Sequence, residues 1–271
     1  MHYLEKYSPI DQKNVLKDLK WKQIKLDQIV PKLKDVLINE SNELVLIKGI
    51  EEETYYSELC DLITKRFKQN FIYTVDIYLE IALNDKFKYI LEKYHIKGIY
   101  SFSQFIKTRI DNISGFQQFL YKKDGNIKNI EDVLPMEFGE LYSANELKNF
   151  LLNKGYSYQK YHLSKDKMIN DRKMAPYIDD YYLNLSKIEI NNDIIKEVIL
   201  FTDNLISSKR YINKNDLKEI DIQINNNYNV TPSLAAYLLE NSGYYLIEAY
   251  QGSKYELPII TNKNHCVYHH Y

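Results

Sequence analysis

The sequence predicts an α+β fold that is mainly α, with helical N-terminal and central segments. Three observations predict it: apolar residues recur at helical spacing along most of the chain, two segments end in paired β-rich runs around a turn, and glycine and proline are few, at 8 and 6 of 271 residues. A chain of this length can bury the core of one large domain or of about two to three small ones.

Residues 1–50 are expected to form an N-terminal helical segment. Two amphipathic helices are predicted over 11–40, the second striped by Ile24, Leu33 and Leu37. Pro31 lies inside that stripe, where proline kinks a helix or starts a new one. Residues 43–48 have the pattern of a short buried strand.

Residues 51–130 carry the first of two similar orders of elements. We predict a helix, a short strand, a helical stretch broken near Asn84, a third helix and a hairpin, at 52–69, 71–73, 75–94, 101–113 and 116–130. Ser101 and Gln104 have the spacing of a capping box. Asp124-Gly125, within the expected turn 122–125, is a strong hairpin signal.

Residues 192–271 repeat that order. We predict a helix, a short strand, a second helix, a third helix and a hairpin, at 192–207, 210–212, 214–224, 231–241 and 244–260. Asn213 is a plausible N-cap of the second helix, and Thr231 before Pro232 opens the third. Gly243 ends the third helix.

Residues 131–191 lie between the two orders. A helix is predicted over 143–154, with Ser143 and Glu146 at capping-box spacing. A less regular helical stretch is expected over 164–185. Both a third, degenerate unit and a helical connector fit this pattern.

The order helix, strand, helix, helix, hairpin, found at 51–130 and 192–262, resembles a winged helix-turn-helix domain. Two such units in tandem resemble plasmid replication initiators and some transcription regulators, which implies a third helix that enters the major groove of DNA. They also resemble kleisin-interacting tandem winged-helix proteins, which implies a protein partner within a larger complex.

The first unit has the charge for duplex DNA. Between Leu62 and Ile110 there are nine basic and four acidic residues, a net charge of +5. Its third helix buries Phe102 and Phe105 by spacing and is expected to present polar side chains outward, while lysines lie at the predicted hairpin tip. The predicted DNA-contacting residues are Ser103, Gln104, Lys107, Thr108, Arg109, Lys122, Lys123 and Lys128.

The second unit is acidic, with six basic and nine acidic residues between Asp193 and Ile260, a net charge of −3. Its third helix carries no basic residue, and a phosphate backbone would repel it. We therefore expect residues 192–262 to mediate protein contact or dimerisation, through Tyr237, Tyr244, Tyr245 and Tyr250.

Catalytic motifs are not found: the sequence has no phosphate-binding loop, no dinucleotide fingerprint, no His-Glu-x-x-His and no Gly-x-Ser-x-Gly. We expect no cofactor and no metal, since the tail residues His265, Cys266, His269 and His270 have no second ligand pair elsewhere. Asp179-Asp180 is interpreted as a solvated face. An enzyme, as a nuclease or phage-defence effector, stays the third hypothesis.

We expect the protein to be located in the cytoplasm. No apolar run approaches the roughly 18 residues that span a bilayer, and the N-terminus lacks a secretory h-region. Only two cysteines occur, Cys60 and Cys266, so no disulfide framework is predicted. The 26 tyrosines suit either coding bias or base stacking.

Overall fold

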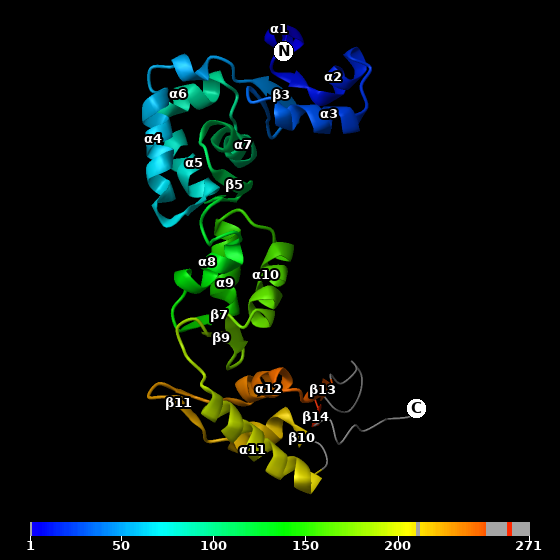
Figure 1. Cartoon of the computed structure of the whole chain (residues 1–271), viewed down its shortest axis with the longest axis vertical. Coiled ribbons are helices and arrows are strands. Elements are labelled where there is room, and N and C mark those ends of the chain that lie inside the picture. Colours follow the sequence, from blue (N-terminus) through cyan, green and yellow to red (C-terminus); the bar gives the residue numbers. More distant parts are fainter. Residues whose placement is uncertain (1, 210–211, 248–258, 262–271) are drawn as a thin grey trace. The chain divides into compact units, whose positions relative to one another are not determined.

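A computed structural model of the chain describes residues 2–209, 212–247 and 259–261. The fold is α+β and mainly helical, as predicted (Figure 1). The chain divides into two compact units, residues 1–133 with 151–157 and residues 134–150 with 158–271. Each unit is described by itself.

One topology recurs four times. Each of the three-stranded sheets is antiparallel, and in each the third strand along the chain lies between the first and the second. Helices separate the first strand from the other two, and a further helix precedes it. We name these segments modules A (10–46), B (71–122), C (141–184) and D (212–261).

Module A follows the helix α1 (His2–Tyr7). Its elements are β1 (Ile10–Asp11), α2 (Gln12–Asp18), α3 (Gln23–Ile29), the 3-10 helix η1 (Val30–Lys32), β2 (Val36–Ile38) and β3 (Glu43–Leu46). Pro31 lies in the first turn of η1, where a new helix follows α3, which agrees with its expected role as a breaker. The helix predicted through Leu37 is wrong, because Val36 and Leu37 pair with Leu46 and Val45 as strands.

The sheet of module A is buried on both faces. Val36 and Leu44 pack into the core of module A with Val15 and Leu26. Successive strand residues point to opposite faces, and Leu37 and Val45 accordingly join the core formed by the helices of module B. An apolar core therefore joins modules A and B.

Module B follows the 3-10 helix η2 (Ile50–Glu52), α4 (Tyr56–Arg66) and the 3-10 helix η3 (Phe67–Gln69). Its elements are β4 (Phe71–Tyr73), α5 (Thr74–Ala82), α6 (Asp85–Lys93), α7 (Ile99–Arg109), β5 (Ile113–Phe116) and β6 (Phe119–Lys122). The predicted break is confirmed, since the Asn84 side chain caps α6. The capping box predicted from Ser101 is wrong, because α7 begins earlier, with Gly98 as N-cap.

The hairpin of module B has another register than predicted. Its turn lies between Phe116 and Phe119, whereas Asp124-Gly125 follows the second strand. The cause is tertiary: β6 is the central strand, with Leu120 fully buried between β4 and β5. Burying that strand positions the turn, which overrides the local Asp-Gly signal.

Module C follows α8 (Ile130–Glu137), and its elements are β7 (Leu141–Ser143), α9 (Ala144–Asn153), α10 (Tyr158–Asn170), β8 (Met174–Pro176) and β9 (Tyr181–Asn184). The capping box of Ser143 and Glu146 is confirmed by hydrogen bonds in both directions. The helical stretch predicted over 164–185 is wrong in its second half, which forms two strands paired on either side of a turn at Asp179.

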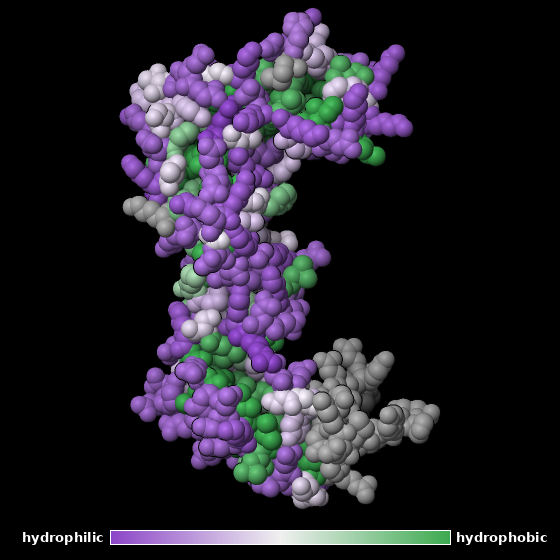
Figure 2. Space-filling view, in the orientation of Figure 1, coloured by the Kyte–Doolittle hydropathy of each residue, from purple (hydrophilic) through white to green (hydrophobic). Residues whose placement is uncertain are grey.

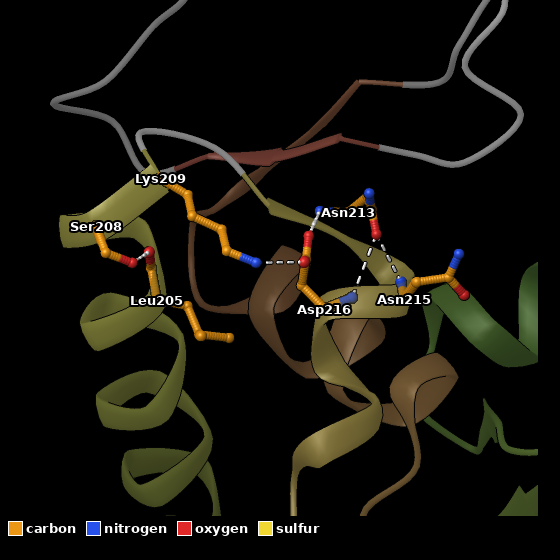
Figure 3. Close-up of polar contacts among 6 residues, drawn as sticks. All are labelled: Leu205, Ser208, Lys209, Asn213, Asn215 and Asp216. Carbon is orange, nitrogen blue, oxygen red and sulfur yellow. Dashed lines mark hydrogen bonds and ion pairs between the residues drawn. The ribbon is translucent and has the colours of Figure 1, made fainter.

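Module D follows α11 (Asn192–Lys209). Its elements are β10 (Ile212–Asn213), the 3-10 helix η4 (Lys214–Glu219), the hairpin β11 (Gln223–Asn225) and β12 (Tyr228–Asn229), α12 (Pro232–Asn241), β13 (Tyr245–Ile247) and β14 (Ile259–Thr261). Asn213 is an N-cap as predicted, but the helix predicted over 214–224 is wrong beyond Glu219, because Gln223 and Asn225 pair with β12 as a strand. The backbone N–H of Asn213 donates to Asp216, which pairs with Lys209 at 2.7 Å (Figure 3). Thr231 caps α12 as predicted.

The modules share hydrogen bonds at equivalent positions, although the residues at those positions differ. The residue after the first strand donates its backbone N–H to the residue before the third strand in modules A, B and C: Gln12 to Asn42 (3.2 Å), Thr74 to Gln118 (3.0 Å) and Ala144 to Asp180 (2.7 Å). In three modules the last residue of the first strand caps the next helix: Asp11, Ser143 and Asn213. Each of these two features thus recurs in three of the four modules.

Candidate nucleic-acid interface

The predicted DNA-reading side chains of α7 are largely engaged inside unit 1. Ser103 is 1% exposed, and its hydroxyl donates to the Tyr100 carbonyl. The Thr108 hydroxyl donates to the Phe105 carbonyl. Lys107 donates to the Gly115 carbonyl at 3.3 Å, and burial lowers the pKa of its ammonium group. The predicted outward position of Ser103 is therefore wrong.

The side chains of Gln104 and Arg109 bind residues of module A. The Gln104 amide accepts from the Ile38 N–H at 3.2 Å and donates to the Ile38 carbonyl at 3.0 Å. The Arg109 guanidinium, with its side chain 9% exposed, bridges Asp35 at 2.7 Å and Glu51 at 2.6 Å. Both polar side chains are thus structural contacts between modules A and B.

Glu40 covers the start of α7. It lies in the β2–β3 turn of module A and accepts backbone N–H groups of Tyr100 (2.8 Å) and Ser101 (3.1 Å), while the Ser101 hydroxyl donates to its second oxygen. A carboxylate at a helix N-terminus satisfies donors that the helix itself leaves open. Together with Gln104 and Arg109, it occupies the side of α7 that the sequence assigned to DNA.

The predicted basic hairpin tip is wrong for Lys122 and Lys123. Lys122 ends the central strand β6, and its N–H donates to the Asn70 carbonyl. Lys123 follows the strand and is exposed, as is Lys128, whose ammonium lies 5.4 Å from the Tyr121 ring. The tip itself carries the exposed Phe116.

Two of the predicted protein-contact tyrosines, Tyr237 and Tyr244, are engaged within unit 2. All residues from Leu234 to Leu239 are buried, so α12 is a core helix. Tyr237 lies in that core, which corrects its assignment to an interface, and the Tyr244 hydroxyl donates to Asp203 at 2.6 Å. Tyr245 belongs to β13, whereas Tyr250 and the tail at His265–His270 lie outside the described residues.

A basic surface that the sequence prediction missed lies on α2, α3 and the turns beside them. Residues 12–34 contain seven lysines and two aspartates, a net charge of +5. All seven lysines are exposed, and none forms an ion pair within the described part of the chain: Lys13, Lys17, Lys20, Lys22, Lys25, Lys32 and Lys34. Counting charge in residues 12–34 would have found it.

The two aspartates of this basic surface are engaged by neutral groups. Asp18 accepts the Tyr3 hydroxyl at 2.5 Å, which raises the pKa of Tyr3 to about 12. Asp27 accepts the Gln23 amide at 2.7 Å. Neither carboxylate pairs with a lysine, so the positive charge of the seven ammonium groups faces solvent.

Helix α3 has one buried and one open side. Leu26 is buried in the module A core, whereas Gln23, Ile24 and Gln28 are exposed. The Lys25 ammonium lies 4.6 Å from the Trp21 ring at the start of the helix. Hydrophilic side chains project from this end of unit 1 in the space-filling view (Figure 2). The open side combines amide groups with flanking cations.

The described residues contain neither a metal-ligand cluster nor a membrane-spanning helix. No group of three or more potential metal ligands occurs there, and no helix is both long and apolar enough to cross a bilayer. Neither the comparison with protein-family models nor the one with curated proteins gives a match to this chain.

Proposed function

We propose that this chain binds duplex DNA through the basic surface of α2 and α3, and that modules A to D are winged-helix domains. The observation that carries the proposal is the set of seven exposed lysines without carboxylate partners around an open third helix. The order of strands, with the third between the first and second in every module, supports the winged-helix assignment.

The physical basis is electrostatic. Duplex DNA carries about one negative charge per 1.7 Å of its axis, and lysines that neutralise phosphates release condensed cations. Gln23 and Gln28 on the open side of α3 have amide groups of the kind that bind base edges in the major groove. Among the third helices, α7 is covered by module A and α12 is buried, whereas α3 and α10 each have an exposed side. The surface of α2, α3 and the turns beside them is distinguished by its seven exposed lysines without carboxylate partners among the described residues.

The test is duplex binding measured by fluorescence anisotropy across a salt series, with the full chain. For the wild type we expect log K to fall linearly with log salt. Lys17→Ala/Lys22→Ala/Lys25→Ala should weaken binding at least tenfold at low salt and reduce the slope by about 2 to 3, since each phosphate contact contributes roughly 0.9.

The matched control is Lys122→Ala/Lys123→Ala/Lys128→Ala, which removes the same charge from the end of β6 and the segment that follows it. We expect its affinity to stay within about threefold of the wild type, because a general charge effect is screened over a Debye length of about 10 Å. Equal losses in the two triple variants, or no binding of the wild type at low salt, would overturn the proposal.

A further inference from the structure

Unit 2 contains a cavity of about 300 Å³ outside the proposed DNA surface. Five of its lining residues, which we call the aliphatic floor, are Leu185, Ile188, Ile190, Ile195 and Leu238, and Asn241 and Ser242 line it as well. Tyr237 lines it too, and that hydroxyl donates to the Ile169 carbonyl at 3.2 Å. The volume is at the lower end of the range of ligand pockets, so it suits a small molecule.

Two opposite charges line the same cavity. They are Arg172, in the turn after α10, and Glu189, in the segment before α11. Neither takes part in an ion pair among the described residues, with each other or with a third group. Both residues are exposed. An exposed cation and an exposed anion beside aliphatic residues, neither in an ion pair, are complementary to a ligand that brings both charges and an apolar side chain.

The position of Arg172 is fixed by its backbone. The N–H of Lys173 donates to the Met168 carbonyl at 2.9 Å and the N–H of Arg172 to Ile169 at 3.1 Å, which closes the end of α10 with Arg172 in the left-handed region at φ 55°. The same motif ends other helices at Lys20, His95, Gly155 and Gly243. Glycine is the residue without strain there.

We propose that this cavity binds a free aliphatic amino acid, with the carboxylate at Arg172, the ammonium at Glu189 and the side chain on the aliphatic floor. Charge-assisted hydrogen bonds at both ends give recognition of a zwitterion. An analogue that lacks one charged group forgoes one of the two charge-assisted contacts, which lowers its affinity relative to that of the zwitterion.

The test is calorimetric titration of the full chain with L-leucine, 4-methylpentanoate and 3-methylbutylamine, which differ only in the charged groups. We expect saturable binding of leucine, at least tenfold tighter than that of either analogue. Arg172→Gly should remove the preference for leucine over the amine, and Glu189→Gln the preference for leucine over the acid.

Arg172→Gly distinguishes a ligand-binding role of Arg172 from a role in folding. If the side chain stabilised the fold, its removal would lower Tm, whereas a side chain that only binds ligand leaves the relief of backbone strain to raise Tm. Relief of the left-handed strain should raise Tm by about 1 to 4 °C while leucine binding falls at least tenfold. The matched control is His95→Gly, the same motif in unit 1, which should raise Tm similarly and leave leucine binding unchanged. No saturable leucine binding, an acid that binds as tightly as leucine, or unchanged leucine binding in Arg172→Gly would each overturn the proposal.

Discussion

The side-chain amide of Gln104 pairs with both backbone polar groups of Ile38, 66 positions earlier in the chain. Ile38 ends β2, an edge strand of module A, and unpaired edges invite association. The amide of α7 therefore satisfies an exposed strand edge in the way a neighbouring strand would. The same contact takes Gln104 away from any partner outside the chain.

Arg109 should be a stability residue of unit 1. Arg109→Ala leaves the Asp35 and Glu51 carboxylates without a cation between modules A and B, and we expect the free energy of unfolding to fall by about 1 to 3 kcal/mol in urea denaturation. The control is Arg66→Ala, whose ion pair with Glu80 is exposed and should contribute less than about 1 kcal/mol. Equal losses in the two variants would contradict this assignment.

Gly98 and Glu40 should show coupled substitutions. A Cβ at Gly98 would lie 2.5 Å from Glu40 Oε1, although the extended backbone there accepts any residue. Moving the carboxylate breaks its hydrogen bonds to Tyr100 and Ser101. Gly98→Ala should therefore lower the free energy of unfolding by about 1 to 2 kcal/mol.

In a Glu40→Ala background the same Gly98 substitution should cost less than half as much, which chemical denaturation of the four proteins of a double-mutant cycle can measure. Gly139→Ala is the control, because its nearest neighbour would be 3.7 Å away. Additive losses would show that the close approach does not matter.

The capping box of module C should make stability depend on pH in the acid range. Hydrogen bonds from the Ser143 backbone and side chain hold the pKa of Glu146 below its ordinary value. Because the folded-state pKa is lowered, the stabilisation is complete above the unfolded-state pKa and is lost as the pH falls through the lowered value. Glu146→Gln should therefore flatten the pH dependence of Tm below about pH 5.

Ser143→Ala is the partner variant of that experiment. It removes the side-chain hydrogen bond but keeps the backbone one, so it should flatten the same curve only in part. Both curves should meet that of the wild type near the acid end, where the carboxyl is protonated. A wild-type slope retained in Glu146→Gln would assign the acid sensitivity to other groups.

Asn184 should be intolerant of a carboxylate. It is fully buried at the end of β9, and its amide N–H groups donate to the carbonyls of Pro135 (2.8 Å) and Gly139 (3.2 Å). Asn184→Asp replaces the N–H donors by an anion that faces carbonyl oxygens. We expect the free energy of unfolding to fall by about 2 to 4 kcal/mol, measured by thermal or urea unfolding.

Asn191→Asp is the matched control, since the Asn191 side chain acts as an acceptor and donates to no group among the described residues. Its Oδ1 receives the N–H groups of Asp193 and Ile194 at the start of α11. Aspartate accepts the same hydrogen bonds, and its negative charge interacts favourably with the helix dipole. The free energy of unfolding should therefore change by no more than about 0.5 kcal/mol. A large loss at Asn191 with none at Asn184 would reverse this view of the two amides.

Local signals predicted what neighbours in sequence decide. The break at Asn84, the cap at Thr231 and the box of Ser143 with Glu146 are each formed by side chains within a few residues of the backbone groups they bind. The hairpin of module B failed because the turn follows the strand that the sheet buries, and Leu120 becomes central only through pairing with β4. No local pattern encodes that choice.

The sequence by itself determined the mainly helical α+β class, several helix caps and the charge of each segment. Tertiary structure alone decided which charged helix is open. Segments 62–110 and 12–34 have equal net charge, yet packing of Leu37 and Val45 into the module B core brings Asp35, Ile38 and Glu40 onto α7. Exposure depends on which distant surface buries apolar area against a helix, and that is a property of the folded chain.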